Sequence, residues 1–306
     1  MQDASARQAF ETAVAQIEDG NREGARETLS GVLDAYPEYA EARLALGILL
    51  GSDGKKSEAR RHMRMALDQL GVDTRTGTES LRGQVLVNLC ALALEEGDWE
   101  EVAAFESEFE TVQDALQRQG IVEQAASILF DAANRAVKEE RVTQARRLYL
   151  RAVSLDTEFG EAWYNLAVIA SEDGELPEAQ EYLRRAVAAE ETFADAHFLL
   201  GTLLLPTSPE EAVTHMEKAV GLAPDNAQWT TLLGSAYARE RDFEHARETF
   251  ARAVRLDDSH ADAHLGFAVA SRALGDEESA RSALRRAFEL NPELAGRIQQ
   301  MMQDRE

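Results

Sequence analysis

Apolar residues recur along this chain at intervals of three and four positions, the spacing that places side chains on one face of an α-helix. Only 6 prolines and 19 glycines interrupt the 306 residues. Alanine, glutamate, leucine and arginine, which have high helix propensity, are abundant. The pattern therefore predicts an all-α chain.

The same pattern returns at a nearly constant period. The segments that begin at Gly160 and Ala227 align without gaps over a whole repeat. Units start near residues 6, 40, 83, 126, 160, 194, 227 and 261, at spacings of 34, 43, 43, 34, 34, 33 and 34 residues. We therefore expect one solenoid of eight helix-turn-helix units over residues 1–306, in which each unit buries its apolar face on the next.

Two columns of small residues run through the units. The eighth position holds Ala13, Gly47, Cys90, Ala133, Ala167, Gly201, Gly234 and Ala268. The twentieth position, counted one residue shorter in the sixth unit, holds Ala25, Ala59, Val102, Ala145, Ala179, Ala212, Ala246 and Ala280. Large residues flank both columns, so the two helices of each unit are predicted to pack closely where the small columns meet.

These columns resemble the tetratricopeptide repeat family, whose signature combines W-x2-L-G-x2-Y, A-x3-F and a closing proline. The closing place holds Pro37, Pro224 and Pro292, and the resemblance spans about residues 6–292. It implies a right-handed superhelical solenoid that binds other proteins and is not an enzyme. The third unit departs from the signature, with Glu106 in place of a large residue and Phe109 in place of alanine.

The two long spacings predict local irregularities. In the third unit an apolar stripe from Phe105 to Leu116 predicts a long second helix that ends at Gly120. Residues 71–80, which are rich in glycine, threonine and serine, predict a loop that could act as a hinge. A short helix over residues 293–303 is expected to cap the last repeat. Glycines at the fifteenth position are interpreted as helix C-caps: Gly20, Gly54, Gly97, Gly174 and Gly275.

The net charge of −24 limits the classes of partner. Such an acidic surface repels phosphate backbones, so we expect no nucleic-acid binding. The apolar segments are too short to cross a bilayer, and no signal peptide precedes them, so a soluble cytoplasmic protein is predicted. A periplasmic or secreted location remains open if a signal peptide was removed. The single Cys90 is compatible with a reducing compartment.

No arrangement of residues predicts catalysis, a cofactor or a metal. Cys90 stands in the column of small buried residues, which already explains it. His260 and His264 lie four residues apart, a spacing that would bring two imidazoles to one helical face, but further ligands are missing. His264 also occupies the fourth position of its unit, where the family has a bulky, partly buried residue. We therefore predict no catalytic or metal-binding residues.

The resemblance implies that positions two, five, nine, twelve and thirteen of each first helix line a binding groove. The predicted groove residues are Phe130, Asn134, Lys138, Glu161, Tyr164, Asn165, Val168, Asp195 and Phe198. The same positions of the last two units hold Thr231, Arg239, Leu265, Val269 and Arg272. An extended segment or helix of a partner, with apolar anchors and basic flanks, matches this combination of apolar and acidic residues. The alternative is that these side chains only pack against one another or against a capping segment.

Some family members clamp a partner's C-terminal carboxylate with two asparagines and several basic residues. Asn134 and Asn165 match part of that clamp, but Asp195 and Phe130 stand where basic residues are needed. We therefore do not predict binding of this kind. The predicted function is a non-enzymatic scaffold that binds a peptide or helix of another protein in its groove. The alternative is a structural protein that assembles into homo-oligomers by stacking its solenoid ends.

Overall fold

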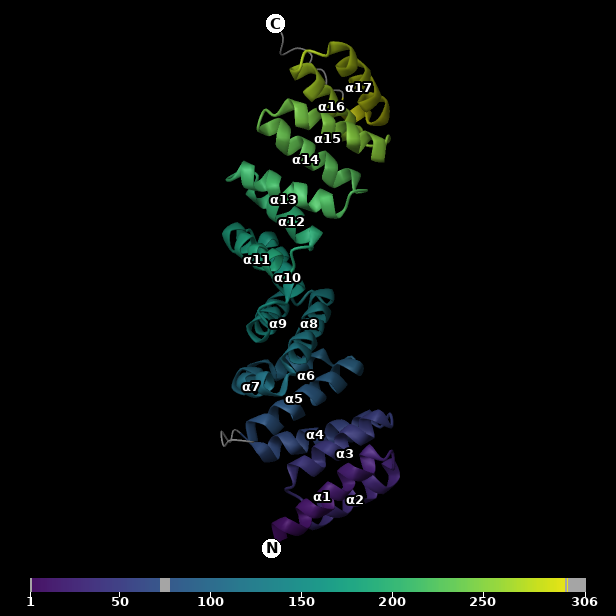
Figure 1. Cartoon of the computed structure of the whole chain (residues 1–306), viewed down its shortest axis with the longest axis vertical. Coiled ribbons are helices and arrows are strands. Elements are labelled where there is room, and N and C mark those ends of the chain that lie inside the picture. Colours follow the sequence, from purple (N-terminus) through teal and green to yellow (C-terminus); the bar gives the residue numbers. More distant parts are fainter. Residues whose placement is uncertain (1, 72–77, 295, 297–306) are drawn as a thin grey trace. The chain divides into compact units, whose positions relative to one another are not determined.

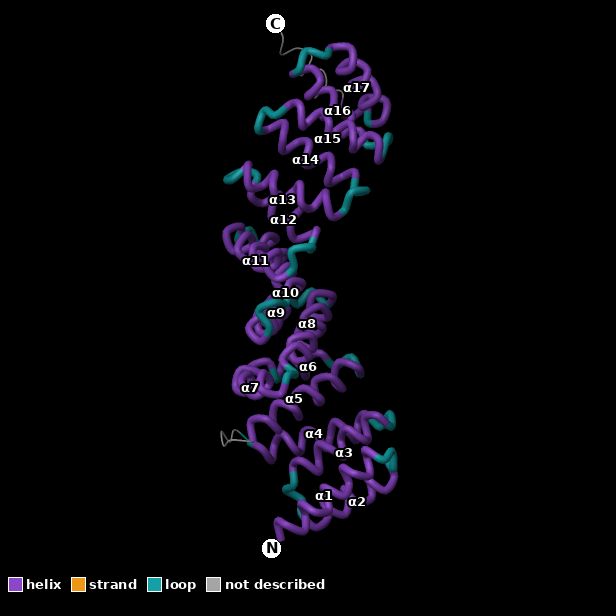
Figure 2. Tube along the Cα trace, viewed as in Figure 1, coloured by secondary structure: helices purple, strands orange, loops and turns teal. Residues whose placement is uncertain are grey.

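A computed structural model describes residues 2–71, 78–294 and 296. These residues form seventeen α-helices and one 3-10 turn, with no strand among them (Figures 1 and 2). The prediction of an all-α protein built from helix-turn-helix repeats is confirmed. The chain divides into two units, residues 1–162 and 163–306, and each is described by itself. The prediction that residues 1–306 form a single solenoid stays a prediction.

Unit 1 is built from consecutive helices that pair with one another. The first helix of a repeat packs on the second (α1 on α2, α3 on α4, α8 on α9), and the second packs on the first helix of the next repeat (α2 on α3, α4 on α5). The helices are α1 (Gln2–Glu18), α2 (Arg22–Ala35), α3 (Ala40–Ser52), α4 (Lys56–Leu70), α5 (Thr78–Glu95), α6 (Trp99–Ala104), α7 (Glu106–Gln119), α8 (Val122–Lys138) and α9 (Val142–Leu155). The boundary with unit 2 falls inside α10 (Gly160–Glu172).

Unit 2 follows the same order of packing. Its pairs include α12 with α13, α14 with α15 and α16 with α17, and the first helices α14 and α16 also contact each other. After α10 come α11 (Leu176–Ala189), α12 (Ala194–Leu204), α13 (Pro209–Leu222), α14 (Ala227–Arg239), α15 (Phe243–Leu256), α16 (Ala261–Ala273), α17 (Glu277–Leu290) and a 3-10 turn, Pro292–Leu294. One face of each first helix is therefore left outside the pairing.

The small columns lie where the two helices of a pair cross. The alanines of both columns are at most 1% exposed. A Cβ atom added to Gly47 would lie 2.9 Å from Cγ of Met63, and one added to Gly201 would lie 2.8 Å from the carbonyl oxygen of Ala212. Only a small residue fits at such a distance, so the predicted helix–helix contact is confirmed. Each fully buried leucine beside it, such as Leu183, stabilises the fold by about 1.5–3 kcal/mol.

In the third repeat, the prediction of one long second helix is wrong. The helix is broken at Phe105, which ends α6 and begins α7. The apolar stripe is nevertheless buried, because α7 turns Phe109, Val112 and Leu116 onto α5. Gly120 ends α7 in the left-handed conformation, with φ of 67°, as expected. The break lets α6 and α7 each pack on α5.

The structure describes the predicted glycine C-caps completely, and the predicted loop and capping helix only in part. Five glycines of the fifteenth position have φ between 76° and 85°, which confirms that they are helix C-caps. In the predicted loop 71–80, α5 already begins at Thr78, so residues 78–80 are helical, and residues 72–77 lie outside the described residues. Most of the predicted capping helix 293–303 also lies outside them; within the described part, Leu294 packs in the last core cluster.

Candidate partner-binding face

The predicted groove residues of unit 2 lie on two first helices, α10 and α12. Tyr164, Asn165 and Val168 of α10 and Phe198 of α12 are half-buried, and Asp195 is exposed. Burial, with a smaller effect of the Asp195 carboxylate, raises the pKa of the Tyr164 hydroxyl. We call this surface the first-helix face: positions two, five, nine and twelve of α12, α14 and α16, with Tyr164 and Val168 of α10.

Aromatic side chains at position five contact residues at the beginning of the next first helix, either its N-cap or its first turn. Tyr164 packs on Phe193, with ring centroids 5.0 Å apart. Phe198 stacks on Trp229, with centroids 4.6 Å apart and ring planes 9° apart. Such pairs contribute about 0.5–1.5 kcal/mol beyond the area they bury. These rings therefore hold successive repeats together, and only part of each remains available to a partner.

The predicted groove residues of unit 1 have similar surroundings. The ring of Phe130 is half-buried and packs on Phe159, with centroids 4.8 Å apart. The side-chain oxygen of Asn134 accepts a hydrogen bond from the hydroxyl of Tyr149, at 2.5 Å. Lys138 and Glu161 are exposed. Asn134 is thus engaged inside its own repeat, an arrangement different from a carboxylate clamp.

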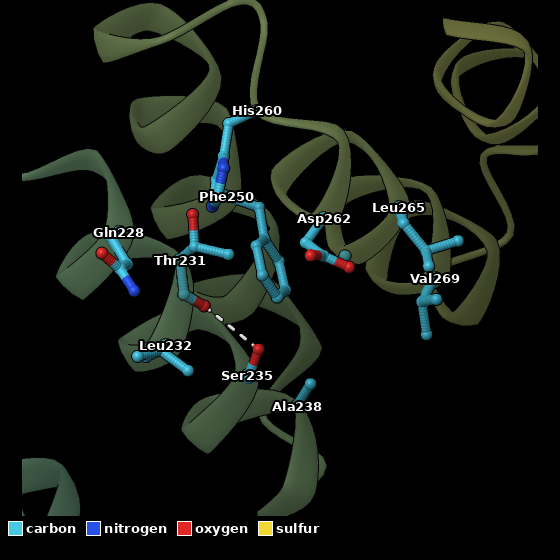
Figure 3. Close-up of a pocket in the computed structure, with 11 residues that line it drawn as sticks. Gln228, Thr231, Leu232, Ser235, Ala238, Phe250, His260, Asp262, Leu265 and Val269 are labelled. Carbon is cyan, nitrogen blue, oxygen red and sulfur yellow. Dashed lines mark hydrogen bonds between the residues drawn. The ribbon is translucent and has the colours of Figure 1, made fainter. Parts of the chain in front are cut away.

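A pocket of about 490 Å³ opens on the first-helix face between α14 and α16. Its lining residues come from positions two, five, six, nine and twelve of the two helices, together with His260 at the N-cap of α16 and one ring from α15 (Figure 3). They include Gln228, Thr231, Leu232, Ser235, Ala238, Phe250, His260, Asp262, Leu265 and Val269. The pocket contains Thr231, Leu265 and Val269, which the sequence placed at groove positions of the last two repeats, and none of the nine predicted groove residues between Phe130 and Phe198. That these nine residues bind a partner stays a prediction.

Beside the pocket, a glycine of α16 lets a ring of α15 pack closely. Gly266, at position six of its repeat, also lines the pocket and lies against the ring of Phe250. A Cβ atom there would lie 2.2 Å from Cε1 of that ring, so any side chain at this position would overlap it. Every other repeat has a side chain at position six. The ring of Phe250, which is 2% exposed, therefore fills the space that a side chain at this position would take.

The polar groups of the pocket mainly accept hydrogen bonds. The hydroxyl of Thr231 donates to the carbonyl oxygen of Ala227 at 2.8 Å, and that of Ser235 donates to the carbonyl oxygen of Thr231 at 3.1 Å. With their hydrogens used on the backbone, both oxygens present lone pairs. Among the described residues that line the pocket, Asp262 carries the only formal charge when His260 is neutral. The pocket therefore combines apolar side chains with polar groups that include an exposed carboxylate, an amide and an imidazole.

The side chain at position four contacts the loop before its own helix in three repeats, and in two of them this side chain is a histidine. Nε2 of His264 lies 3.0 Å from the carbonyl oxygen of Asp258, and Nε2 of His197 lies 3.1 Å from that of Glu191. Arg43 of unit 1 donates in the same way to Pro37, at 2.7 Å. Each side chain therefore ties a first helix to the loop six residues before it. His260 instead caps α16, so the two histidines four residues apart have different surroundings.

The sequence offered two other candidates for a chemical site, the single cysteine and a set of metal ligands. Cys90 is fully buried, and burial raises the pKa of its thiol far above the usual range. Within the described ranges, no group of three or more potential ligands could hold a metal ion. Over the same part of the chain, no helix has the length and apolar character needed to cross a bilayer.

Comparison with known proteins agrees with this architecture. The model of the family described as "Tetratricopeptide repeat" matches residues 10–72, 130–190, 170–227, 207–259 and 231–295. Among curated proteins, anaphase-promoting complex subunit 3 of Schizosaccharomyces pombe is 26% identical over 154 residues, half of this chain and 23% of that protein. Protein O-mannosyl-transferase Tmtc3 of Drosophila melanogaster is 25% identical over 122 residues, 39% of this chain and 13% of that protein. The chain thus spans less than a quarter of either relative.

Solved structures show the same fold. YrrB, described as a TPR protein with an unusual peptide-binding site, superposes with a TM-score of 0.52 and 24% identity. That match covers 58% of this chain and 91% of YrrB. A MamA protein superposes with a TM-score of 0.51 and 20% identity, over 58% of this chain and 96% of that one. The likeness extends to the repeat architecture.

Proposed function

Because this chain belongs to the tetratricopeptide repeat family, we propose that it is a non-enzymatic scaffold whose first-helix face binds an extended segment or helix of a partner protein. The observation that carries the proposal is the pocket between α14 and α16, whose lining includes residues at the repeat positions expected to contact a partner. Proteins of this fold generally act as interaction scaffolds.

Exposed apolar surface supports the same proposal. Leu232, on the rim of the pocket, is 39% exposed. Val168 and Phe198 of the first-helix face are half-buried. Apolar side chains that stay open to solvent in a patch are typical of an interaction site. The acidic chain would attract a partner with basic flanks, and the apolar anchors would then slow its dissociation.

A matched pair of leucines tests the proposal. Leu232→Ser removes an exposed apolar side chain from the pocket rim, whereas Leu256→Ser removes one of similar exposure, 37%, from α15 outside the pocket. Affinity capture from the cells that make this protein, with quantitative mass spectrometry, should show partners retained by the wild type and by Leu256→Ser but lost by Leu232→Ser. Equal capture by both variants would place the binding surface elsewhere.

Self-assembly remains a second candidate because Phe288, in the last described α-helix, is 47% exposed. An exposed phenylalanine near the end of a repeat array could pack against a second copy. Sedimentation velocity over a hundredfold range of concentration would detect this. Assembly that disappears in Phe288→Ser would favour this candidate, and a monomer throughout would remove it.

A further inference from the structure

A second pocket, of about 460 Å³, lies among α15, α16 and α17 and shares no residue with the pocket between α14 and α16. We call it the second-helix pocket; its lining includes Val254, His264, Phe267, Ala283 and Arg286. We infer that it binds an aromatic side chain of a partner protein that carries a hydrogen-bond donor, as tyrosine and histidine do. This surface is separate from the first-helix face, so the inference does not depend on the proposed function.

The repeat of α12 and α13 shows what fills the same space elsewhere in unit 2. Its fourth position holds His197, and its twenty-third position, counted one residue shorter, holds His215. The two rings lie 5.2 Å apart, with their Nδ1 atoms 2.9 Å apart. In the last repeat the same positions hold His264 and Ala283. The second ring is therefore missing there, and the pocket lies beside the residues that replace the pair.

The repeat of α10 and α11 has the same arrangement with other aromatic residues. Trp163 at position four stacks on Tyr182 at position twenty-three, with ring centroids 5.6 Å apart. The guanidinium of Arg185, at position twenty-six, lies 4.7 Å from the centre of the Trp163 ring. The last repeat has Arg286 at that position, so it keeps the cation and lacks only the ring at position twenty-three.

Two further small residues widen the space. Between α11 and α13, Arg184 and Glu211 form an ion pair at 3.3 Å. The corresponding residues of α15 and α17 are Ala251 and Ser279, which both line the second-helix pocket. No such ion pair can therefore cross it, and the volume is sufficient for a ring.

The imidazole of His264 determines which polar group the occupant needs. Its Nε2 lies 3.0 Å from the carbonyl oxygen of Asp258, an atom that can only accept, so Nε2 carries the hydrogen. In the neutral imidazole, Nδ1 is then an acceptor. Within the described part of the chain, His264 makes its polar contacts through Nε2 alone, and Nδ1 is not among the fully buried polar atoms without a partner. An occupant that donates to Nδ1 would supply the contact that His215 makes in the earlier repeat.

The charges at the pocket favour an uncharged occupant. The guanidinium of Arg286 lies 2.8 Å from the carboxylate of Asp258 and 3.6 Å from that of Glu289, so the cation is already paired. Val254 and Phe267 are half-buried and leave apolar surface open beside this pair. A neutral ring with one donor matches both the apolar surface and the single open acceptor.

Peptide selection tests the inference. Twelve-residue peptides displayed on phage would be selected on the wild-type chain, and those that lose binding in Ala283→His, where an imidazole of the chain itself fills the pocket, would be synthesised. Ala273→His, at an exposed alanine of α16 outside the pocket, serves as the control and should bind them all. We expect these peptides to share a tyrosine or a histidine at a fixed position. Replacing that residue by phenylalanine keeps a ring, removes the donor and should weaken binding about three- to tenfold.

A variant of the acceptor completes the cycle. His264→Phe keeps a ring and removes Nδ1, so it should bind the original and the phenylalanine peptides equally. If this variant does not fold, as judged by circular dichroism, the comparison of the two peptides on the wild type decides alone. Peptides that depend on Ala283 but bind equally well with phenylalanine would overturn the inference, and so would a selection without any peptide that depends on Ala283. Leu232→Ser should leave these peptides bound, so neither result touches the proposed function.

Discussion

Replacing Gly201 by alanine is expected to destabilise unit 2, although the same change stabilises most helices. Gly201 lies in α12 at the eighth position of its repeat, where α13 crosses. A Cβ atom would lie 2.7 Å from Cγ of Met216, 2.8 Å from the carbonyl oxygen of Ala212 and 3.2 Å from the amide nitrogen of Met216. Two of these three atoms belong to the backbone of α13, so they cannot rotate away and the helices must separate.

The magnitude follows from two opposing effects. Alanine gains about 1 kcal/mol over glycine in a helix interior. Overpacking a helix contact costs about 1–3 kcal/mol. Gly221 of α13, in the same repeat, provides the control, because a Cβ atom there would have no neighbour within 4 Å. Gly221→Ala should therefore stabilise by about 1 kcal/mol, and the free energies of unfolding of the two variants should differ by about 1–3 kcal/mol.

Urea denaturation followed by far-ultraviolet circular dichroism would measure this difference. At a slope of about 3 kcal/mol per molar urea, 1 kcal/mol shifts the midpoint by about 0.3 M. Because long repeat arrays can unfold in stages, hydrogen exchange of the amides in α12 and α13 should be recorded as well. Equal increases of the midpoint in both variants would refute the close approach of the two helices at Gly201.

Three further changes test other contacts. Glu140 holds a left-handed φ of 61° where five repeats have glycine, so Glu140→Gly should raise the free energy of unfolding by about 0.5–1 kcal/mol in urea titrations. Arg43→Leu removes the guanidinium that donates to the carbonyl oxygen of Pro37, which still accepts from the Gln69 amide, and should cost about 0.5–1.5 kcal/mol in the same assay. Nδ1 of His197 lies 2.9 Å from Nδ1 of His215, and burial lowers both pKa values. The folded protein therefore favours the neutral form of both histidines. The stability that this preference contributes is complete above the unfolded pKa of about 6.5 and is lost as pH falls through the lower folded pKa values. The urea midpoint should fall below pH 6.5, and less steeply in His215→Gln; an unchanged slope would contradict this.

The repeat fold could be predicted because its strongest constraint is steric and lies in few columns. Glycine occupies the eighth position where the large residue of the second helix is methionine or phenylalanine, as in the pairs Gly47 with Met63 and Gly234 with Phe250. Alanine occupies it where that residue is leucine or tyrosine. The break at Phe105 could not be predicted in this way, because no glycine or proline lies near it and the apolar stripe continues through it.

The candidate site was predicted less completely, because a list of side chains does not show which are already in contact or where space is left. Tyr164 was expected to contact a partner, yet its ring meets Phe193, 29 residues later, at the spacing that also joins Phe130 to Phe159. That regular spacing joins position five to the residue just before the next first helix, and it could have indicated the pairing. At Gly266 the missing side chain leaves no space, because the ring of Phe250 from another helix fills it and is 2% exposed. Which positions of a first helix stay open to a partner is therefore decided by contacts with other helices, and a list of residues at repeat positions does not contain those contacts.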